Sequence, residues 1–258
     1  MTSGLPLQGR SIVITRPAHQ AALITQRLQA AGAHVTGFPL LEIVEPKDQL
    51  AYLSHLSKLS QYDYLIFTSP NAVDRALSKL SGKVPVGVKV AAVGKKTAQA
   101  LSRQNIVVSV VPENTFNSEA LLACPELQSA KGQSFAIIRG EGGRDLLRDT
   151  LRLRGAQVDY LDVYRRVCPA DDLLPIVKLR EQGGLDIIVL TSVESLQNLF
   201  RLGSGESWLD RATLLVGSER IAEMVRQTSH IGSVLIATDP SDETIYGRLL
   251  SWANEKKS

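Results

Sequence analysis

The chain matches itself at a constant offset of 123 residues, from Gly9 with Gly132 through to Ser118 with Ser241. The period is much longer than the roughly 20–50 residues of solenoid repeats, so each copy has the size of a domain. We therefore expect two like domains, and a cleft between domains is a common place for a ligand. The same shift aligns several polar and small residues: Arg16 with Arg139, Asp63 with Asp186, Thr68-Ser69 with Thr191-Ser192, and Gly94 with Gly217.

Each copy alternates short β-rich runs with helical patterns, which is typical of parallel α/β proteins. In the first copy, residues 11–15 form an apolar strand pattern, and a helical pattern follows that stops at Gly32. The apolar run 106–111 predicts a further strand, and in the second copy residues 157–167 predict a long extended segment. The predicted fold class is α/β, with two similar domains that each contain a parallel sheet.

Composition places the chain among soluble globular proteins of two ordinary domains, because it has 258 residues, 44% apolar and 21% charged. The net charge of +3 is too small to indicate nucleic acid, but it suits an anionic small molecule. Neither a signal peptide nor a membrane-spanning run is apparent. Cys124 and Cys168 lack metal-ligand spacing and the four histidines are scattered, so we expect a reduced cytoplasmic protein without a metal site.

Ligands of parallel α/β sheets bind beyond the carboxyl ends of the strands. Thr15-Arg16 and Arg139-Gly140-Glu141 occupy such ends, each just before a helix start. Helix N-termini and arginine side chains together suit a carboxylate or phosphate, and the glycines let the backbone approach a ligand. The alternative is that both arginines pair with acidic surface residues. The glycine pattern does not match a dinucleotide fingerprint.

Hydroxyl groups end the next pair of strands, at Ser69 with Asn71 two residues later, and at Ser192. We predict that these residues contact a ligand. Serine is also a favoured helix N-cap, so capping is the alternative interpretation, and the two roles are compatible. Ser118 and Ser241 are interpreted most simply as N-caps.

Glycines end a third pair of strands, in Gly94-Lys95-Lys96-Thr97 and in Gly217-Ser218-Glu219-Arg220. Gly94, Thr97, Gly217, Ser218 and Arg220 are candidate substrate-binding residues, because glycine allows close approach and a helix N-terminus follows. A glycine chosen only for a tight turn is the alternative.

Tyr164 is the candidate catalytic residue, within the sequence Asp-Val-Tyr-Arg-Arg of the long extended segment. A phenol can donate a proton at neutral pH. The alternative is a tyrosine packed at the sheet edge with its hydroxyl in water.

The order of the segments TRP, FTSPNAV, AVGKKTA, RGEGGRD, VYRR, LTS and VG resembles the uroporphyrinogen-III synthase family over nearly the whole chain. The resemblance implies two α/β domains joined by a two-stranded β-ladder. One domain would comprise residues 1–37 and 168–258, the other residues 45–160, and the ladder residues 38–44 and 161–167. It also implies that the first strand and helix of each copy exchange places between the domains.

The resemblance further implies an enzyme of haem biosynthesis, a carbon-oxygen lyase that cyclises hydroxymethylbilane to uroporphyrinogen III with inversion of ring D and loss of water. Tyr164 would be its acid, and no cofactor would be needed. It implies a monomer, with transient contact to hydroxymethylbilane synthase as a further expectation. Two alternatives are a periplasmic-type binding protein, which would need export, and an inactive relative fused or bound to another enzyme of the pathway.

Overall fold

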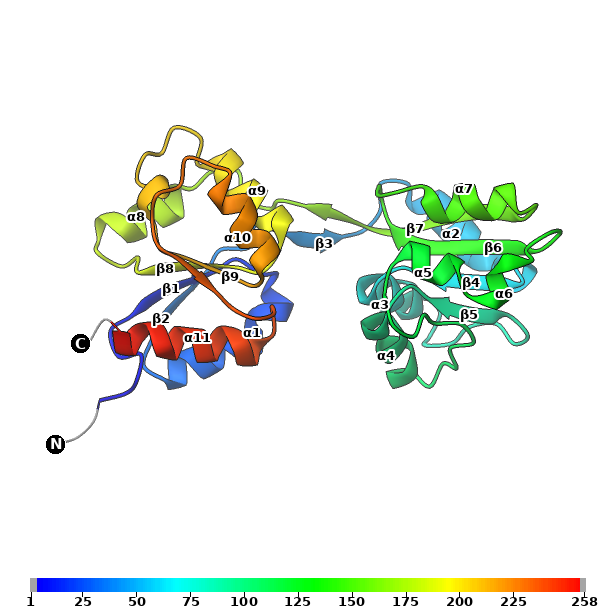
Figure 1. Cartoon of the computed structure of the whole chain (residues 1–258), viewed down its shortest axis with the longest axis horizontal. Helices are drawn as coiled ribbons and strands as arrows, with labels where there is room; N and C mark the ends of the chain where they lie inside the picture. The colour runs from blue at the N-terminus through cyan, green and yellow to red at the C-terminus, as the bar shows by residue number, and fades with distance from the viewer. Residues whose placement is uncertain (1–3, 256–258) are drawn as a thin grey trace. The chain divides into compact units, whose positions relative to one another are not determined.

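The computed structural model describes residues 4–255. The chain divides into two compact units, residues 1–42 with 167–258 (the first unit) and residues 43–166 (the second unit) (Figure 1). Each unit contains a five-stranded sheet, and the pairs whose direction is described are parallel. The predicted α/β fold class is confirmed.

The sheet of the first unit lies between two layers of helices. Ile12 and Ile14 of the central strand pack into the core under one layer, whereas Val13 packs into the core under the other, as expected for alternating strand residues. The strands run in the order β10 (Val234–Ile236), β9 (Leu214–Val216), β8 (Ile187–Leu190), β1 (Ser11–Ile14) and β2 (His34–Gly37). One helical layer contains α1 (Ala18–Ala30) and α11 (Asp242–Glu255), and the other contains α8 (Leu174–Glu181), α9 (Val193–Leu202) and α10 (Glu219–Arg226).

The second unit has the same three layers. Leu65 and Phe67 face one core, and Tyr64 and Ile66 face the other. The strands run in the order β3 (Glu42–Val44), β7 (Gln157–Val167), β6 (Ser134–Gly140), β4 (Tyr64–Phe67) and β5 (Lys89–Ala92). One layer contains α2 (Gln49–Ser57), α3 (Pro70–Lys79) and α4 (Lys95–Arg103), and the other contains α5 (Ser118–Leu122), α6 (Pro125–Gln128) and α7 (Leu146–Leu153).

Each sheet combines strands from both halves of the sequence. β1 pairs with β8 through Ile12 and Ile187, and β6 pairs with β4 through Phe135 and Tyr64. Phe135 lies 123 residues after Ile12, and Tyr64 lies 123 residues before Ile187, so the two central pairings have equivalent registers. The exchange of first strands is the arrangement that the family resemblance implies.

An aspartate at the start of a strand holds the neighbouring strand in both sheets. The Asp186 carboxylate accepts a hydrogen bond of 2.7 Å from the backbone N–H of Ser11. In the second unit, Asp63 accepts hydrogen bonds from the backbone N–H (2.7 Å) and the hydroxyl (2.8 Å) of Ser134. These bonds from Ser134 are the main reason that the pKa of Asp63 lies below its usual value. We call these two contacts the aspartate clasps.

The predicted strand at residues 106–111 is wrong. Within the described chain this segment has one isolated β-bridge, from Val110 to Ala91 on the edge strand β5. Alternate residues of the run are exposed, Val107 to 83%. Further pairing with β5 would therefore bury little additional apolar surface.

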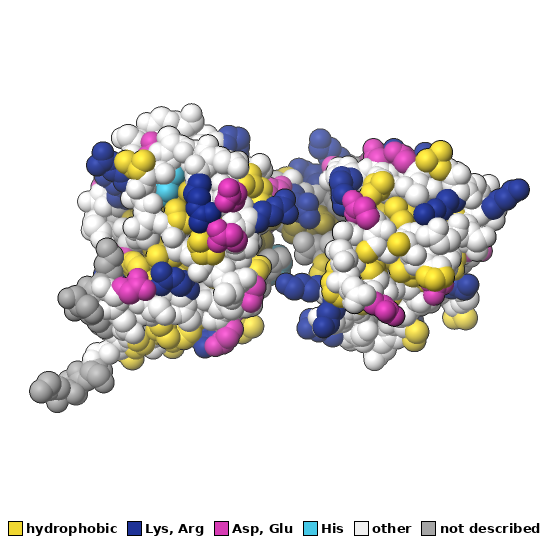
Figure 2. Space-filling view, in the orientation of Figure 1, with side chains coloured by type: hydrophobic (Ala, Val, Ile, Leu, Met, Phe, Trp, Pro, Cys, Tyr) yellow, Lys and Arg dark blue, Asp and Glu magenta, His cyan; other side chains and the backbone are white. Residues whose placement is uncertain are grey.

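Charged side chains of both signs are interspersed over the face shown in Figure 2. This distribution agrees with the small net charge of +3. Among residues 4–255, no helix is long and apolar enough to span a membrane.

Candidate active site

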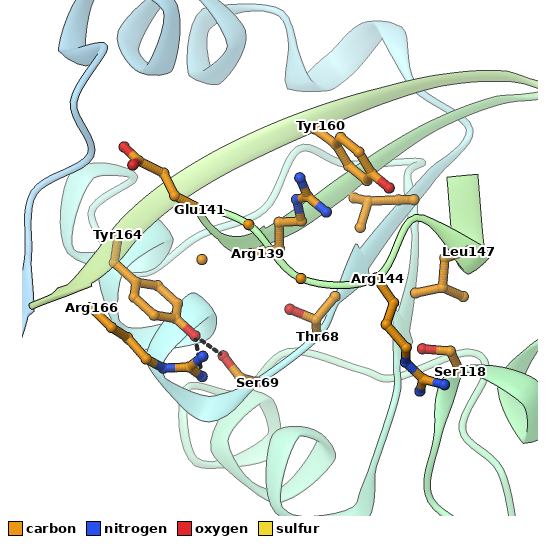
Figure 3. A pocket seen from close by; sticks show the side chains of 14 residues that line it. Thr68, Ser69, Ser118, Arg139, Glu141, Arg144, Leu147, Tyr160, Tyr164 and Arg166 are labelled. Atoms are coloured by element: carbon orange, nitrogen blue, oxygen red, sulfur yellow. Dashed lines mark hydrogen bonds between the residues drawn. The ribbon is translucent and has the colours of Figure 1, made fainter. Parts of the chain in front are cut away.

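A pocket opens at the carboxyl ends of β4 and β6 in the second unit, where sequence reasoning expects a ligand. It encloses about 670 Å³, including the open space at its mouth. Residues just after β4, from β6 and β7, and in the loop after β6 meet there (Figure 3). The lining residues are Thr68, Ser69, Ser118, Ile137, Arg139, Gly140, Glu141, Gly142, Gly143, Arg144, Leu147, Tyr160, Tyr164 and Arg166.

Tyr164 contributes the phenol of this pocket. The residue is only 2% exposed, and its hydroxyl lies 3.1 Å from the Ser69 Oγ. Arg166 Nη2 donates a second hydrogen bond, of 3.3 Å, to the same phenol oxygen. Figure 3 shows both contacts at the end of the ring. The alternative of a tyrosine with a wet hydroxyl at the sheet edge therefore does not describe this side chain.

Gly140 makes room for the Tyr164 ring. A Cβ atom at position 140 would lie 2.5 Å from Cζ and 2.9 Å from the hydroxyl oxygen of Tyr164. The two residues are paired across β6 and β7, where the register shifts between Arg139 and Gly140. The Glu141 N–H also donates to the Tyr164 carbonyl oxygen at 2.7 Å, which fixes the backbone beside the ring.

Ser69 joins the pocket to a helix N-terminus. It is the N-cap of α3, and its hydroxyl oxygen accepts a bond of 3.1 Å from the Ala72 N–H. Pro70 follows at the first helical position, where its missing N–H costs nothing. The capping interpretation is confirmed for Ser69, and the same hydroxyl also faces Tyr164.

Arg139 lines the pocket, but acidic side chains already surround it. Its Nε donates to Asp162 at 3.0 Å, its Nη1 lies 3.7 Å from Asp145, and its guanidinium stacks 3.4 Å from the centre of the Tyr160 ring. Burial and a hydrogen bond to Asp145 raise the pKa of Tyr160 to about 12. Pairing with acidic residues, the alternative for Arg139, is thus present in this structure.

The glycine-rich loop after β6 borders the pocket. Gly142 and Gly143 have φ angles of +79° and +96°, which L-residues with side chains rarely adopt. The following Arg144 forms an ion pair of 2.5 Å with Glu119 of α5. The Glu141 carboxylate accepts a hydrogen bond from the Lys47 backbone N–H.

The prediction that Ser118 caps α5 is wrong. The cap is Asn117, whose side chain accepts a bond of 2.7 Å from the Ala120 N–H. Ser118 instead lines the pocket. By contrast, the Ser241 hydroxyl accepts a hydrogen bond of 3.4 Å from Thr244 N–H at the start of α11.

Three other candidates of the second unit are absent from the lining of this pocket. Asn71 lies in the first turn of α3, and Gly94 is the N-cap of α4. Thr97 is a buried residue of α4, with 3% of its surface exposed.

In the first unit, Thr15 and Arg16 are held by contacts within the protein. The Thr15 hydroxyl donates to the Val189 carbonyl at 2.7 Å, and the residue is fully buried. Arg16 pairs with Asp242 at 2.5 Å and also donates to the Pro240 carbonyl and the Thr191 hydroxyl. Arg16, like Arg139, therefore has the acidic partner that the alternative interpretation expects.

The remaining candidates of the first unit lie at the ends of β8 and β9. Ser192 caps α9 through a bond of 3.0 Å from the Ser195 N–H, which confirms the capping interpretation. Ser218 is the N-cap residue of α10, but its side chain makes no capping bond. Gly217 precedes it, and Arg220 is exposed on the first turn of α10.

Sequence reasoning missed several side chains of the pocket, among them Thr68, Arg144, Tyr160 and Arg166. A signal for Arg166 was present, because residues two apart on a strand share a face and Tyr164 lies on the same strand. Within residues 4–255, no group of three or more His, Cys, Asp or Glu side chains could hold a metal ion.

Comparison with known proteins gives one consistent result. A family model described as "Uroporphyrinogen-III synthase HemD" matches residues 22–246. The chain is 36% identical to a uroporphyrinogen-III synthase of Salmonella typhimurium, over 84% of this chain and 91% of that protein. It is 31% identical to the Synechococcus elongatus protein of the same name, over 97% of this chain and 98% of that protein.

Solved structures show the same fold. A uroporphyrinogen III synthase of Thermus thermophilus superposes with a TM-score of 0.64 at 18% identity, covering 96% of this chain and all of that one. The uroporphyrinogen-III synthetase of Helicobacter pylori gives a TM-score of 0.59 at 18% identity, covering 94% and 99% of the two chains.

Proposed function

Because the chain belongs to the uroporphyrinogen-III synthase family, and so to the enzymes of tetrapyrrole biosynthesis, we propose that Tyr164 is the acid of its reaction. That reaction closes hydroxymethylbilane to uroporphyrinogen III, with inversion of ring D and loss of water. The observation that supports the assignment is the Tyr164 hydroxyl, which meets the Ser69 hydroxyl and the Arg166 guanidinium beside the pocket.

The proposed reaction starts at the hydroxymethyl carbon of the linear substrate. The C–O bond breaks, the phenol proton of Tyr164 joins the departing hydroxide, and water leaves. The resulting azafulvene cation is attacked by the substituted carbon of ring D, which gives a spiro intermediate. This intermediate fragments and recloses with ring D inverted, and the proton released at the end returns to Tyr164.

Binding relies on groups that favour anions, because the substrate carries eight carboxylates. In the second unit, the N-terminus of α3 follows Ser69, and Arg139 and Arg144 border the pocket. In the first unit, we assign Thr15, Arg16, Ser192, Gly217, Ser218 and Arg220 to substrate binding. For the second unit we add Asn71, Gly94, Thr97, Gly140 and Glu141 to that assignment. Holding the two ends of the substrate in one geometry is what would favour isomer III over the spontaneous isomer I.

The test is analysis of the product isomers. Hydroxymethylbilane is generated in situ by its synthase, the protein is added, and the oxidised uroporphyrins are separated by chromatography. We expect mostly isomer III, whereas a control without the protein gives isomer I. Only isomer I in the presence of the folded protein would contradict the proposed activity.

Tyr164→Phe tests the acid separately. The change removes one hydroxyl and keeps the ring over Gly140, so folding should be retained. We expect kcat to fall by about 100-fold or more, in the range found for general acids. Full activity of a folded Tyr164→Phe protein would rule out the acid role while leaving the synthase activity in place.

We also propose that the protein works as a monomer in the cytoplasm and receives hydroxymethylbilane by transient contact with its synthase. The reason is chemical, since the free substrate closes spontaneously to isomer I. Sedimentation of the two enzymes, alone and mixed during turnover, tests the oligomeric state, and the isomer ratio at varied synthase concentration tests the contact. A stable oligomer of this chain, or an isomer ratio indifferent to synthase concentration at constant substrate flux, would contradict them.

A further inference from the structure

We propose that Arg166 is a positioning residue that directs the Tyr164 proton toward the substrate. The inference rests on the proposed acid role of Tyr164. Arg166 borders the same pocket, and its Nη2 lies 3.3 Å from the phenol oxygen. It reaches the hydroxyl because it is two residues further along β7, on the same face of the strand.

Arginine fixes the direction of this hydrogen bond. A guanidinium has five N–H donors and no acceptor, so the phenol oxygen must accept from Arg166. The phenol hydrogen must then point elsewhere. Within the described contacts, its other neighbour is the Ser69 Oγ at 3.1 Å, which can accept it beside the bond from Ala72.

The result is a directed chain of donors from Arg166 to Tyr164 to Ser69. When a substrate hydroxyl enters beside Ser69, it can take the place of the serine as the acceptor of the phenol hydrogen. The phenol proton thus points toward the substrate side of the pocket, and the opposite side of the Tyr164 oxygen faces the Arg166 guanidinium.

Arg166 also has a role after the proton has left. The O–H bond of Tyr164 breaks, the proton and the departing hydroxide form water, and a negative charge stays on the phenolate oxygen. The guanidinium carbon lies 5.6 Å from the ring centre and its Nη2 contacts the oxygen, so Arg166 balances that charge. The phenolate later accepts the proton released from ring D, which restores the starting state.

The other arginines of the pocket are directed elsewhere. Arg139 contacts Asp162, Asp145 and the Tyr160 ring, and Arg144 contacts Glu119. Neither has a described contact with the Tyr164 hydroxyl. Arg165 is the next residue on β7 and is absent from the pocket lining, since neighbouring strand residues face opposite sides.

The first experiment compares Arg166→Gln, Arg166→Lys and Arg165→Gln in the isomer III assay. We expect Arg166→Gln to lower kcat by about 10- to 100-fold, the usual range for a lost hydrogen bond to a charged group. KM should change by less than about threefold, because a positioning role acts on the proton and not on affinity. Arg166→Lys should recover part of kcat, and Arg165→Gln, the matched loss of one charge, should stay within about twofold.

A double-mutant cycle with Tyr164→Phe decides the mechanism. If Arg166 acts through the phenol, adding Arg166→Gln to Tyr164→Phe lowers kcat no further. If the two losses multiply, or if KM rises instead of kcat falling, Arg166 contacts the substrate independently and the proposal is overturned. Unchanged melting temperatures and circular dichroism separate these results from misfolding, and Arg166→Lys provides a milder variant.

The failure of the broader proposal would look different. An enzyme that makes only isomer I lacks the proposed activity, and a fully active Tyr164→Phe lacks the proposed acid. A loss in Arg166→Gln that persists unchanged in the Tyr164→Phe background overturns the positioning role alone.

Discussion

At the scale of single residues, Tyr164 owes its position to a neighbour without a side chain. Its ring lies over Gly140, and its hydroxyl reaches from β7 past β6 to the N-terminus of α3. Ser69 therefore serves two purposes, since it caps the helix and hydrogen-bonds to the phenol. A close fit of this kind cannot be read from one strand, because it depends on which residue the neighbouring strand places opposite.

Gly140→Ala tests this dependence. The added Cβ would lie 2.5 Å from the tyrosine Cζ, so the ring has to move by about an ångström. Misplacement of that size commonly costs about 100-fold in rate, and overpacking costs about 1–3 kcal/mol in stability. Steady-state kinetics would measure the fall in kcat, and thermal unfolding would measure the loss of stability.

Gly37→Ala is the matched control, because it changes a glycine at the end of a strand with no atom near the added Cβ. It should leave kcat within about twofold of the parent. An active Gly140→Ala protein would mean that the ring position seen here is not required.

At the scale of secondary-structure elements, much of the fold follows from local pattern. A buried apolar run predicted β1, a long extended segment predicted β7, and a helix stop at glycine predicted the end of α1. The strand predicted at residues 106–111 is wrong because an apolar run forms a strand only where it pairs continuously with a neighbouring strand, and this segment has one isolated bridge. The predicted cap of α5 is wrong because Asn117, one residue before Ser118, is the N-cap.

Other features needed information from distant parts of the chain. The pairing of β1 with β8 joins residues that are far apart in sequence, and only the family resemblance implied it. Arg139 and Arg16 were identified at the correct strand ends, but the acidic partners Asp162 and Asp242 come from other elements. Periodicity shows which face a residue occupies and not which residue it meets there.

The Asp63 clasp should contribute to stability in a pH-dependent way. The Ser134 bonds lower the pKa of Asp63 in the folded protein, so its contribution is present above the unfolded pKa near 3.8. It is lost as the pH falls through the lower, folded pKa. Asp63→Asn should therefore reduce the free energy of unfolding by about 1 kcal/mol at pH 7, and by less below pH about 3.

Unfolding in guanidinium chloride at pH 7 and at the acid pH, followed by circular dichroism, measures this difference in the free energy of unfolding. Asp171→Asn makes the same change of charge at an exposed position and should have little effect at either pH. A loss in Asp63→Asn that is equal at pH 7 and at acid pH would exclude the carboxylate charge as its cause.

At the scale of the whole molecule, the two units have separate cores. Each of the described clusters of buried residues lies entirely within one unit. The second unit is continuous in sequence, and its five strands all fall within residues 42–167. It has the size at which many single domains fold alone.

A fragment of residues 42–167 should therefore fold by itself. We expect α/β circular dichroism and one cooperative thermal transition, because the sheet and both of its cores are complete. A fragment of residues 42–153 is the control, since without β7 nothing joins β3 to β6 and it should not fold. A disordered 42–167 fragment would show that the second unit depends on the rest of the chain.

The strand exchange has a consequence for the order of events on the ribosome. β1 is made first, yet its hydrogen-bonded neighbour β8 begins about 175 residues later, at Ile187. The second unit is complete in the nascent chain once Val167 has emerged, so it can fold while β1 still lacks β8. Its folding brings β3 beside β7 and so shortens the loop that must close before the first unit forms. The last part of the protein to fold during synthesis is thus expected to include the first strand that was translated.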